Sequence, residues 1–117
     1  MTVKELVDSN LFTLVHEGDD TSATISKPFC CDLLSIAMSK CPAGAAWVTV
    51  MANINTLAVA SLTESACIIL AEGTRLDEVA EKKARMEGIT IFETEEPVFE
   101  AACKVWQLIG GEYGTDV

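Results

Sequence analysis

The chain has 117 residues, half of them apolar and 22% charged, and its eight Lys and Arg against eighteen Asp and Glu give a formal net charge of −10. A chain of this size forms one domain, and its acidity disfavours nucleic acids and anionic membrane surfaces, which are recognised through Lys and Arg. No apolar run reaches the roughly 18 residues of a membrane span, and the first residues, MTVKELVDSN, lack the order of a signal peptide, so we expect a cytoplasmic protein.

The first third of the chain predicts a short helix, a strand and a long loop. Thr2 followed by Glu5 has the form of a capping box, which predicts a helix ending near Asn10. The apolar run at 11–15 suits a strand, although a buried helical turn fits it as well. The small polar residues that follow, closed by Pro28, predict a loop.

From Asp32 onward, helix and strand patterns alternate. Asp32 is placed to cap a helix over 33–40. Residues 47–51 have strand composition, 54–62 carry apolar residues at helical spacing, and 66–70 form the continuous apolar run of a strand covered on both faces. The residues predicted for the inner faces of these helices and the next one are Leu33, Ile36, Ala37, Ile54, Leu57, Ala58, Leu62, Leu76, Val79, Ala80 and Ala84.

The last third predicts two more helices with a strand between them. Thr74 with Asp77 repeats the capping-box form and opens a helix that Gly88 ends. Residues 89–92 return to strand, and Pro97 is placed to open the final helix. Short connections between alternating strands and helices predict an α/β fold, with three α/β/α layers around a mostly parallel sheet of four to five strands.

The final helix has more apolar surface than one contact can cover. Phe99, Cys103 and Trp106 lie outside its inner stripe. Either a second subunit or the N-terminal segment would cover them, and Trp106 alone, as one exposed apolar residue, would need no explanation. We therefore expect a homodimer with these three residues at its interface.

The loops that follow the central strands are the candidate ligand site, because open parallel sheets bind ligands beyond the carboxyl ends of their strands. Gly73, Thr74 and Arg75 precede a predicted helix whose N-terminus would favour a phosphate or carboxylate, and Asn53 and Asn55 follow the preceding strand. In the more ordinary interpretation, Gly73 makes the turn, Thr74 caps the helix and Arg75 pairs with a carboxylate. We favour the ordinary interpretation, because the chain has no phosphate-binding motif.

The five cysteines form no metal or redox motif, since no CxxC spacing occurs and the chain has a single histidine. Cys67 and Cys103 fall in apolar patterns, where a buried reduced thiol is the usual structure. Cys30, Cys31 and Cys41 flank a predicted helix, where a thiol of low pKa is a further hypothesis. The sequence predicts no catalytic residue, no metal and no cofactor.

The stretch from about 19 to 110 resembles the DRTGG domain. The resemblance rests on the order and spacing of CDLLSIAM at 31–38, WVTV at 47–50, LAVASL at 57–62, ACIILAEG at 66–73, LDEVAEKKARMEGITIFET at 76–94 and FEAACKVWQL at 99–108. It implies an α/β/α domain of the kind found at the N-terminus of HPr kinase. It also implies a non-catalytic regulatory or protein-interaction domain that dimerises. The alternative is a sensor of a nucleotide or a small phosphorylated metabolite.

This chain departs from the family pattern in two loops. The family has an acidic residue and then Thr-Gly-Gly where this chain has Asp20 and then residues 25–28, Ile-Ser-Lys-Pro. Lys and Pro do not permit the backbone conformations that two glycines allow. The loop at 51–53 differs as well. The resemblance therefore implies that the fold is kept while the ligand is changed or lost.

Overall fold

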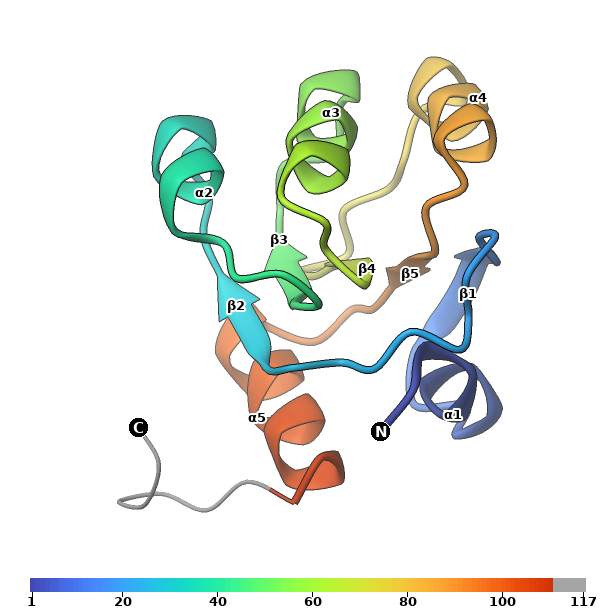
Figure 1. Ribbon diagram of the computed structural model, residues 1–117, viewed down its shortest axis with the longest axis vertical. Helices are drawn as coiled ribbons and strands as arrows, with labels where there is room; N and C mark the ends of the chain where they lie inside the picture. Colours follow the sequence, from blue (N-terminus) through green and yellow to red (C-terminus); the bar gives the residue numbers. More distant parts are fainter. Residues whose placement is uncertain (111–117) are drawn as a thin grey trace.

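The computed structural model describes residues 1–110, in which five helices and five strands form three layers (Figure 1). Helices α2, α3 and α4 cover one face of the sheet, and α1 and α5 cover the other. The elements in chain order are α1 (Val3–Asp8), β1 (Thr13–His16), β2 (Pro28–Cys30), α2 (Leu34–Lys40), β3 (Ala46–Thr49), α3 (Ile54–Leu62), β4 (Cys67–Leu70), α4 (Glu78–Glu87), β5 (Ile91–Glu93) and α5 (Val98–Leu108).

The strand order β1-β5-β4-β3-β2 makes a mostly parallel sheet. Strands β2 to β5 run parallel, and β1 joins the edge antiparallel to β5. The α/β prediction with four to five strands is therefore confirmed. No helix in the described part of the chain is long and apolar enough to cross a membrane.

Two apolar clusters fill the spaces above and below the sheet. Alternation along β4 sends Cys67 and Ile69 into the cluster under α1 and α5, and Ile68 and Leu70 into the cluster under α2, α3 and α4. All four residues are buried, as expected for a strand covered on both faces. The continuous apolar run at 66–70 thus predicted the centre of the fold correctly.

Strand β2 was not predicted, because Pro28 was interpreted as the end of a loop. Pro28 is the first residue of this edge strand, a position where a missing N–H costs no sheet hydrogen bond. The strand begins where Ala46 N donates to Lys27 O at 2.9 Å, and Phe29 then aligns with Trp47 of β3. Tertiary pairing with β3 therefore makes a strand of a segment whose local signals indicate a loop.

Two predicted helix starts were wrong. Leu33, not Asp32, is the N-cap residue of α2, and no side chain caps that helix. Asp32 Oδ1 instead accepts hydrogen bonds from Thr49 Oγ1 at 2.7 Å and Val50 N at 2.9 Å, because it lies beside the end of β3. Helix α4 is capped by Asp77 rather than Thr74, and it begins at Glu78.

Several residues assigned to inner helix faces are exposed, because the helices touch the sheet mainly through smaller neighbours. The buried residues of α2 and α4 are alanines, and those of α3 are Thr56, Leu57, Val59 and Ala60. Helical spacing alone does not separate the buried centre of an apolar face from the residues beside it. Side chains beside the buried residues were therefore predicted to be buried as well. The exposed ones are Leu33, Ile36, Ile54, Leu62 and Val79.

Candidate functional site

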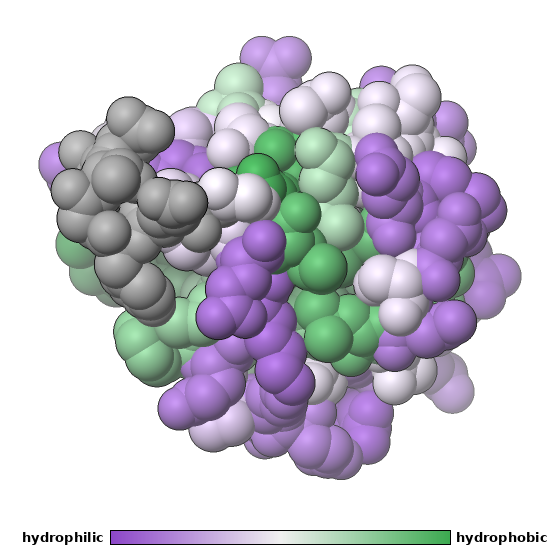
Figure 2. Space-filling view, turned by 90° about the horizontal axis from the view of Figure 1, so that it is seen from below, coloured by the Kyte–Doolittle hydropathy of each residue, from purple (hydrophilic) through white to green (hydrophobic). Residues whose placement is uncertain are grey.

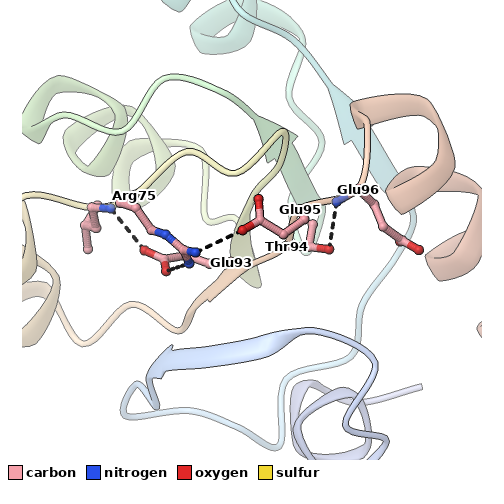
Figure 3. A network of polar contacts seen from close by, with 6 residues as sticks. Arg75, Glu93, Thr94, Glu95 and Glu96 are labelled. Atoms are coloured by element: carbon pink, nitrogen blue, oxygen red, sulfur yellow. Dashed lines mark hydrogen bonds and ion pairs between the residues drawn. The ribbon is translucent and has the colours of Figure 1, made fainter.

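The predicted ligand loops lie at the carboxyl edge of the sheet, where Arg75 is held between two carboxylates (Figure 3). Its guanidinium donates to Glu93 Oε1 at 2.8 Å and to Glu95 Oε1 at 3.0 Å. Glu93 is buried at the end of β5, and its other oxygen accepts from Leu76 N at 3.0 Å. The hydrogen bond to Glu93 and the nearby carboxylate charges raise the pKa of Arg75. The guanidinium is therefore committed to the protein's own carboxylates.

Backbone hydrogen bonds join the loop after β4 to the loop after β5. Glu72 N donates to Glu96 O at 2.8 Å, and Gly73 N donates to Thr94 O at 3.0 Å. The Glu72 carboxylate also accepts from Val98 N at 3.0 Å, at the start of α5. These contacts make the two loops one connected structure rather than two independent ligand loops.

Gly73 and Thr74 have the structural roles of a turn. Gly73 has a φ of +74°, a left-handed backbone conformation that favours glycine. Thr74 N donates to Ala71 O at 3.1 Å within the same turn. The predicted anion site requires a helix that begins directly after these residues. Helix α4 begins only at Glu78, so Gly73 and Thr74 do not lie at a helix N-terminus. Their binding of a ligand stays a prediction.

Asn53 and Asn55 lie in the neighbouring loop, at the start of α3. Asn53 Oδ1 accepts from Asn55 N at 2.9 Å and from Thr56 N at 3.2 Å, which makes Asn53 the helix cap. Because β3 and β4 are adjacent and parallel, the structure brings both predicted loops to one edge of the sheet. The side-chain oxygen of Asn53 is used by the cap, while both residues are exposed.

The amino edge of the sheet carries a hollow of about 360 Å³, here called the amino-edge hollow. Asp20 lies on its wall, and the neighbouring Asp19 N donates to Gly88 O at 3.0 Å, which attaches this loop to the end of α4. No local sequence pattern predicts it, because its walls come from distant segments. The lining residues include Asp20, Gly44, Ser61, Glu64, Glu87 and Thr90.

The outer side of α5 carries the three residues predicted for an interface. Ala101 and Val105 are buried against the sheet, whereas Phe99 is 66% exposed and Cys103 and Trp106 are half-buried. Helix α1 covers the same face of the sheet, and Figure 2 shows apolar residues gathered in the middle of this face. Within residues 1–110, the N-terminal segment therefore leaves most of Phe99 uncovered.

Two of the cysteines have a raised thiol pKa. Burial, followed by the charge of Asp32, raises the pKa of Cys30, which is contrary to the low-pKa hypothesis for this residue. Burial also raises the pKa of Cys67 to about 12, and Cys67 is buried as predicted. Among residues 1–110, no three His, Cys, Asp or Glu side chains are placed to hold a metal ion.

Neither a family model nor a curated protein matches the chain. A solved structure of the CBS and DRTGG domains of the regulatory region of Clostridium perfringens pyrophosphatase, complexed with the activator diadenosine tetraphosphate, is similar, with a TM-score of 0.56 and 14% identity. The similarity covers 68% of this chain and 34% of that one, so the chain spans about a third of that structure's length. This likeness is one of fold, and the chain has a DRTGG-like α/β/α fold.

Proposed function

We propose that the chain is a non-catalytic regulatory domain that acts as a homodimer, paired through the side where β2 lies between α2 and α5. The distribution of charge supports this choice of side. The segments that form this side, residues 27–41 and 98–109, hold three lysines and two carboxylates. The rest of the chain holds five basic and sixteen acidic side chains. Two copies of a chain with a net charge of −10 repel one another except through such a near-neutral side.

Exposed apolar side chains on both helices support the same side. Leu33 and Met38 beside or on α2 are each 55% exposed, and Phe99 on α5 is 66% exposed. These two helices flank β2 from opposite faces of the sheet, on one side of the molecule (Figure 1). A surface shared by two layers offers more area than α5 alone, and a stable interface needs roughly 800 Å² from each partner.

The open edge of β2 is less suited to binding another strand. The strand has three residues, and Pro28 has no N–H to donate. Lys27 O and the residues aligned with β3 already use the hydrogen bonds on the inner side. We therefore expect the second copy to pack against the two helices rather than extend the sheet.

Two observations support a regulatory rather than a catalytic role. The polar residues at the carboxyl edge cap helices or pair with one another, as Asn53 and Arg75 do. The solved structure with a similar fold is a regulatory region of a pyrophosphatase. By analogy, this chain regulates through binding, and the surface that binds is the near-neutral side.

Sedimentation of the full chain at micromolar concentration tests the homodimer. Wild type should sediment at twice its 12.5 kDa mass, and Phe99→Glu should return it to the monomer mass. Val79→Glu is the matched control, because Val79 is 64% exposed but lies on α4, which packs near β1 at the other side of the sheet. A wild-type monomer, or a Phe99→Glu dimer as tight as wild type, contradicts the proposal.

A ligand sensor is the second candidate function, favoured by the amino-edge hollow of about 360 Å³ and by the activator-bound regulatory region with a similar fold. Thermal-shift measurements with ATP and diadenosine tetraphosphate test it. A ligand at 100 times its Kd adds about 2.7 kcal/mol to the free energy of unfolding. Loss of the shift in Arg75→Ala would place the ligand at the carboxyl edge, and no shift with any nucleotide would exclude these ligands.

A further inference from the structure

We propose that the outer face of α3 and α4 binds an acidic amphipathic helix of a partner protein. The two helices lie side by side in the layer that covers one face of the sheet (Figure 1). Four apolar side chains on this face, here called the α3–α4 face, are between 44% and 84% exposed. They are Ile54, Leu62, Val79 and Met86. Exposed apolar side chains on adjacent elements are typical of an interaction surface.

One printed contact aligns the two helices. Ser61 Oγ donates to Glu87 Oε2 at 3.4 Å, so these two residues lie beside each other near the ends of α3 and α4. Leu62 and Met86 are their neighbours in the chain, and both are exposed. This end of the α3–α4 face therefore carries one large apolar side chain from each helix.

The other two apolar side chains lie about two turns earlier. Both helices connect neighbouring parallel strands, so they run in the same direction. Ile54 precedes Leu62 by eight residues, and Val79 precedes Met86 by seven. Two turns of an α-helix span about 11 Å. The four side chains thus form two apolar levels along the helix pair.

Charge separates this face from the rest of the acidic chain. Residues 54–62 hold no charged side chain, and residues 78–87 hold three basic and three acidic ones, whereas the whole chain has a net charge of −10. Four of the six charged side chains of α4 are paired within the helix, as Lys83–Glu87 and Arg85–Glu81. An acidic partner is therefore repelled less at this face than elsewhere on the molecule.

Lys82 gives the α3–α4 face its preference for an acidic partner. It lies three residues after Val79 and four before Met86, so the three side chains share one stripe of α4, away from the buried Ala80 and Ala84. Lys82 is exposed and forms no ion pair within residues 1–110. A carboxylate on a partner would therefore have an unpaired ammonium to meet.

The same residue disfavours a second copy as the occupant. Two copies of the α3–α4 face, related by a twofold axis through the middle of the stripe, would bring two Lys82 side chains together. The other unpaired charge of α4, Glu78, lies in the first turn, where the helix dipole favours a carboxylate. The face therefore suits a partner whose own side chains supply the acid.

A helix laid along the pair has the spacing that this face requires. Its apolar residues at i and i+7 would meet the two apolar levels. Ala58, half-buried between Ile54 and Leu62 on α3, is small enough to lie under a larger apolar residue at i+4. Carboxylates along the α4 side of the bound helix would reach Lys82. The α3–α4 face lies outside the near-neutral side, so the proposal does not depend on the homodimer.

Fluorescence anisotropy with two labelled helical peptides of about 18 residues tests the charge preference on the full chain. Both peptides have leucine at i, i+4, i+7 and i+11. One has glutamate at i+3 and i+10, on one side of the leucine stripe, and the other has glutamine there. The glutamate peptide should bind about threefold more tightly. Lys82→Ala should remove this difference, and the matched control Lys4→Ala, on the opposite face of the sheet, should keep it.

Three exposed positions test the apolar contacts with little risk to the fold. Leu62→Ala should weaken the binding of both peptides by about tenfold, because it removes an apolar contact. Leu108→Ala is the matched control, since Leu108 is an exposed leucine on α5, and it should bind as wild type does. Phe99→Glu should bind the peptides as well as wild type, which separates this proposal from the homodimer.

Four results would overturn the proposal. They are no saturable binding of either peptide up to about 1 mM, equal Kd values for the two peptides, and amide chemical shifts that change outside residues 54–62 and 78–87 when the glutamate peptide is added to labelled chain. The fourth is a wild-type tetramer that Leu62→Glu converts to a dimer in sedimentation, which would assign the α3–α4 face to a second copy.

Discussion

Asp32→Ala should destabilise the fold by removing an acceptor at the end of β3. Asp32 Oδ1 accepts from Thr49 Oγ1 at 2.7 Å and from Val50 N at 2.9 Å. Thr49 is fully buried, so its hydroxyl would lose its carboxylate partner in a place that water does not reach. If Asp32 instead capped α2, as its position in the sequence indicates, Thr49 would have no part in the loss.

The size of the loss follows from the two bonds. A hydrogen bond to a charged group contributes about 1.5–3 kcal/mol, and an unsatisfied buried donor costs about 1–3 kcal/mol. Asp32 is itself exposed, so water weakens part of this interaction. We expect a loss of about 2 kcal/mol in the free energy of unfolding, which lowers Tm by roughly 8 °C in a domain of this size.

Urea unfolding of four variants measures the coupling directly. In the Thr49→Val background, Asp32→Ala should cost about 1 kcal/mol less than in wild type, because the shared bond is already gone. Asp32→Asn is the control that keeps an acceptor oxygen, and its loss should be the smaller one. Equal costs of Asp32→Ala in both backgrounds would refute the reasoning and restore the helix-cap role.

Three further predictions concern packing, pH and salt. Gly18→Ala should lower the free energy of unfolding, measured in urea, by about 1–3 kcal/mol. The reason is that the new Cβ would lie 2.1 Å from Gly88 O. Ser22→Ala, in the same loop, is the control and should be nearly neutral. Burial raises the pKa of Cys67 from 9.0 to about 12, so its contribution to stability is present below pH 9.0 and is lost as pH rises toward 12. Cys67→Ala should flatten that loss in unfolding curves, and an unchanged slope contradicts it. Self-association should tighten with added salt in sedimentation, because screening weakens the repulsion between acidic chains, and tighter pairing at low salt would contradict this.

The fold was predictable where a local signal and the tertiary environment agree. The apolar run at 66–70 can only be buried on both faces, and it is β4 at the centre of the sheet. The capping box of Thr2 and Glu5 and the left-handed Gly88 at the end of α4 are local structures, and both are present. Strand β2 has three residues and depends on β3 for its form, so its own residues carry no strand signal.

The candidate site was predictable only in part. The position of a loop in the chain indicates the edge of the sheet at which it lies, but it does not indicate which side chains its residues contact. The predicted parallel topology implies that Asn53 and Arg75 lie at one edge of the sheet, and they do. That Arg75 pairs with a carboxylate was the favoured interpretation, and the structure confirms it and identifies Glu93 and Glu95. No sequence pattern indicates the amino-edge hollow, because the segments that line it come together only in the folded chain.

Internal hydrogen bonds hold both the segment at Lys27 and Pro28 and the guanidinium of Arg75. Where the resemblance expects two glycines, this chain has Lys27 and Pro28, and there the backbone enters the sheet, with Lys27 O accepting from Ala46 N at 2.9 Å. This segment is the start of an edge strand rather than an open loop. At the other edge, Arg75 is occupied by Glu93 and Glu95. Internal bonds hold both segments, so we expect a second copy of the chain to bind at the near-neutral side around β2 instead.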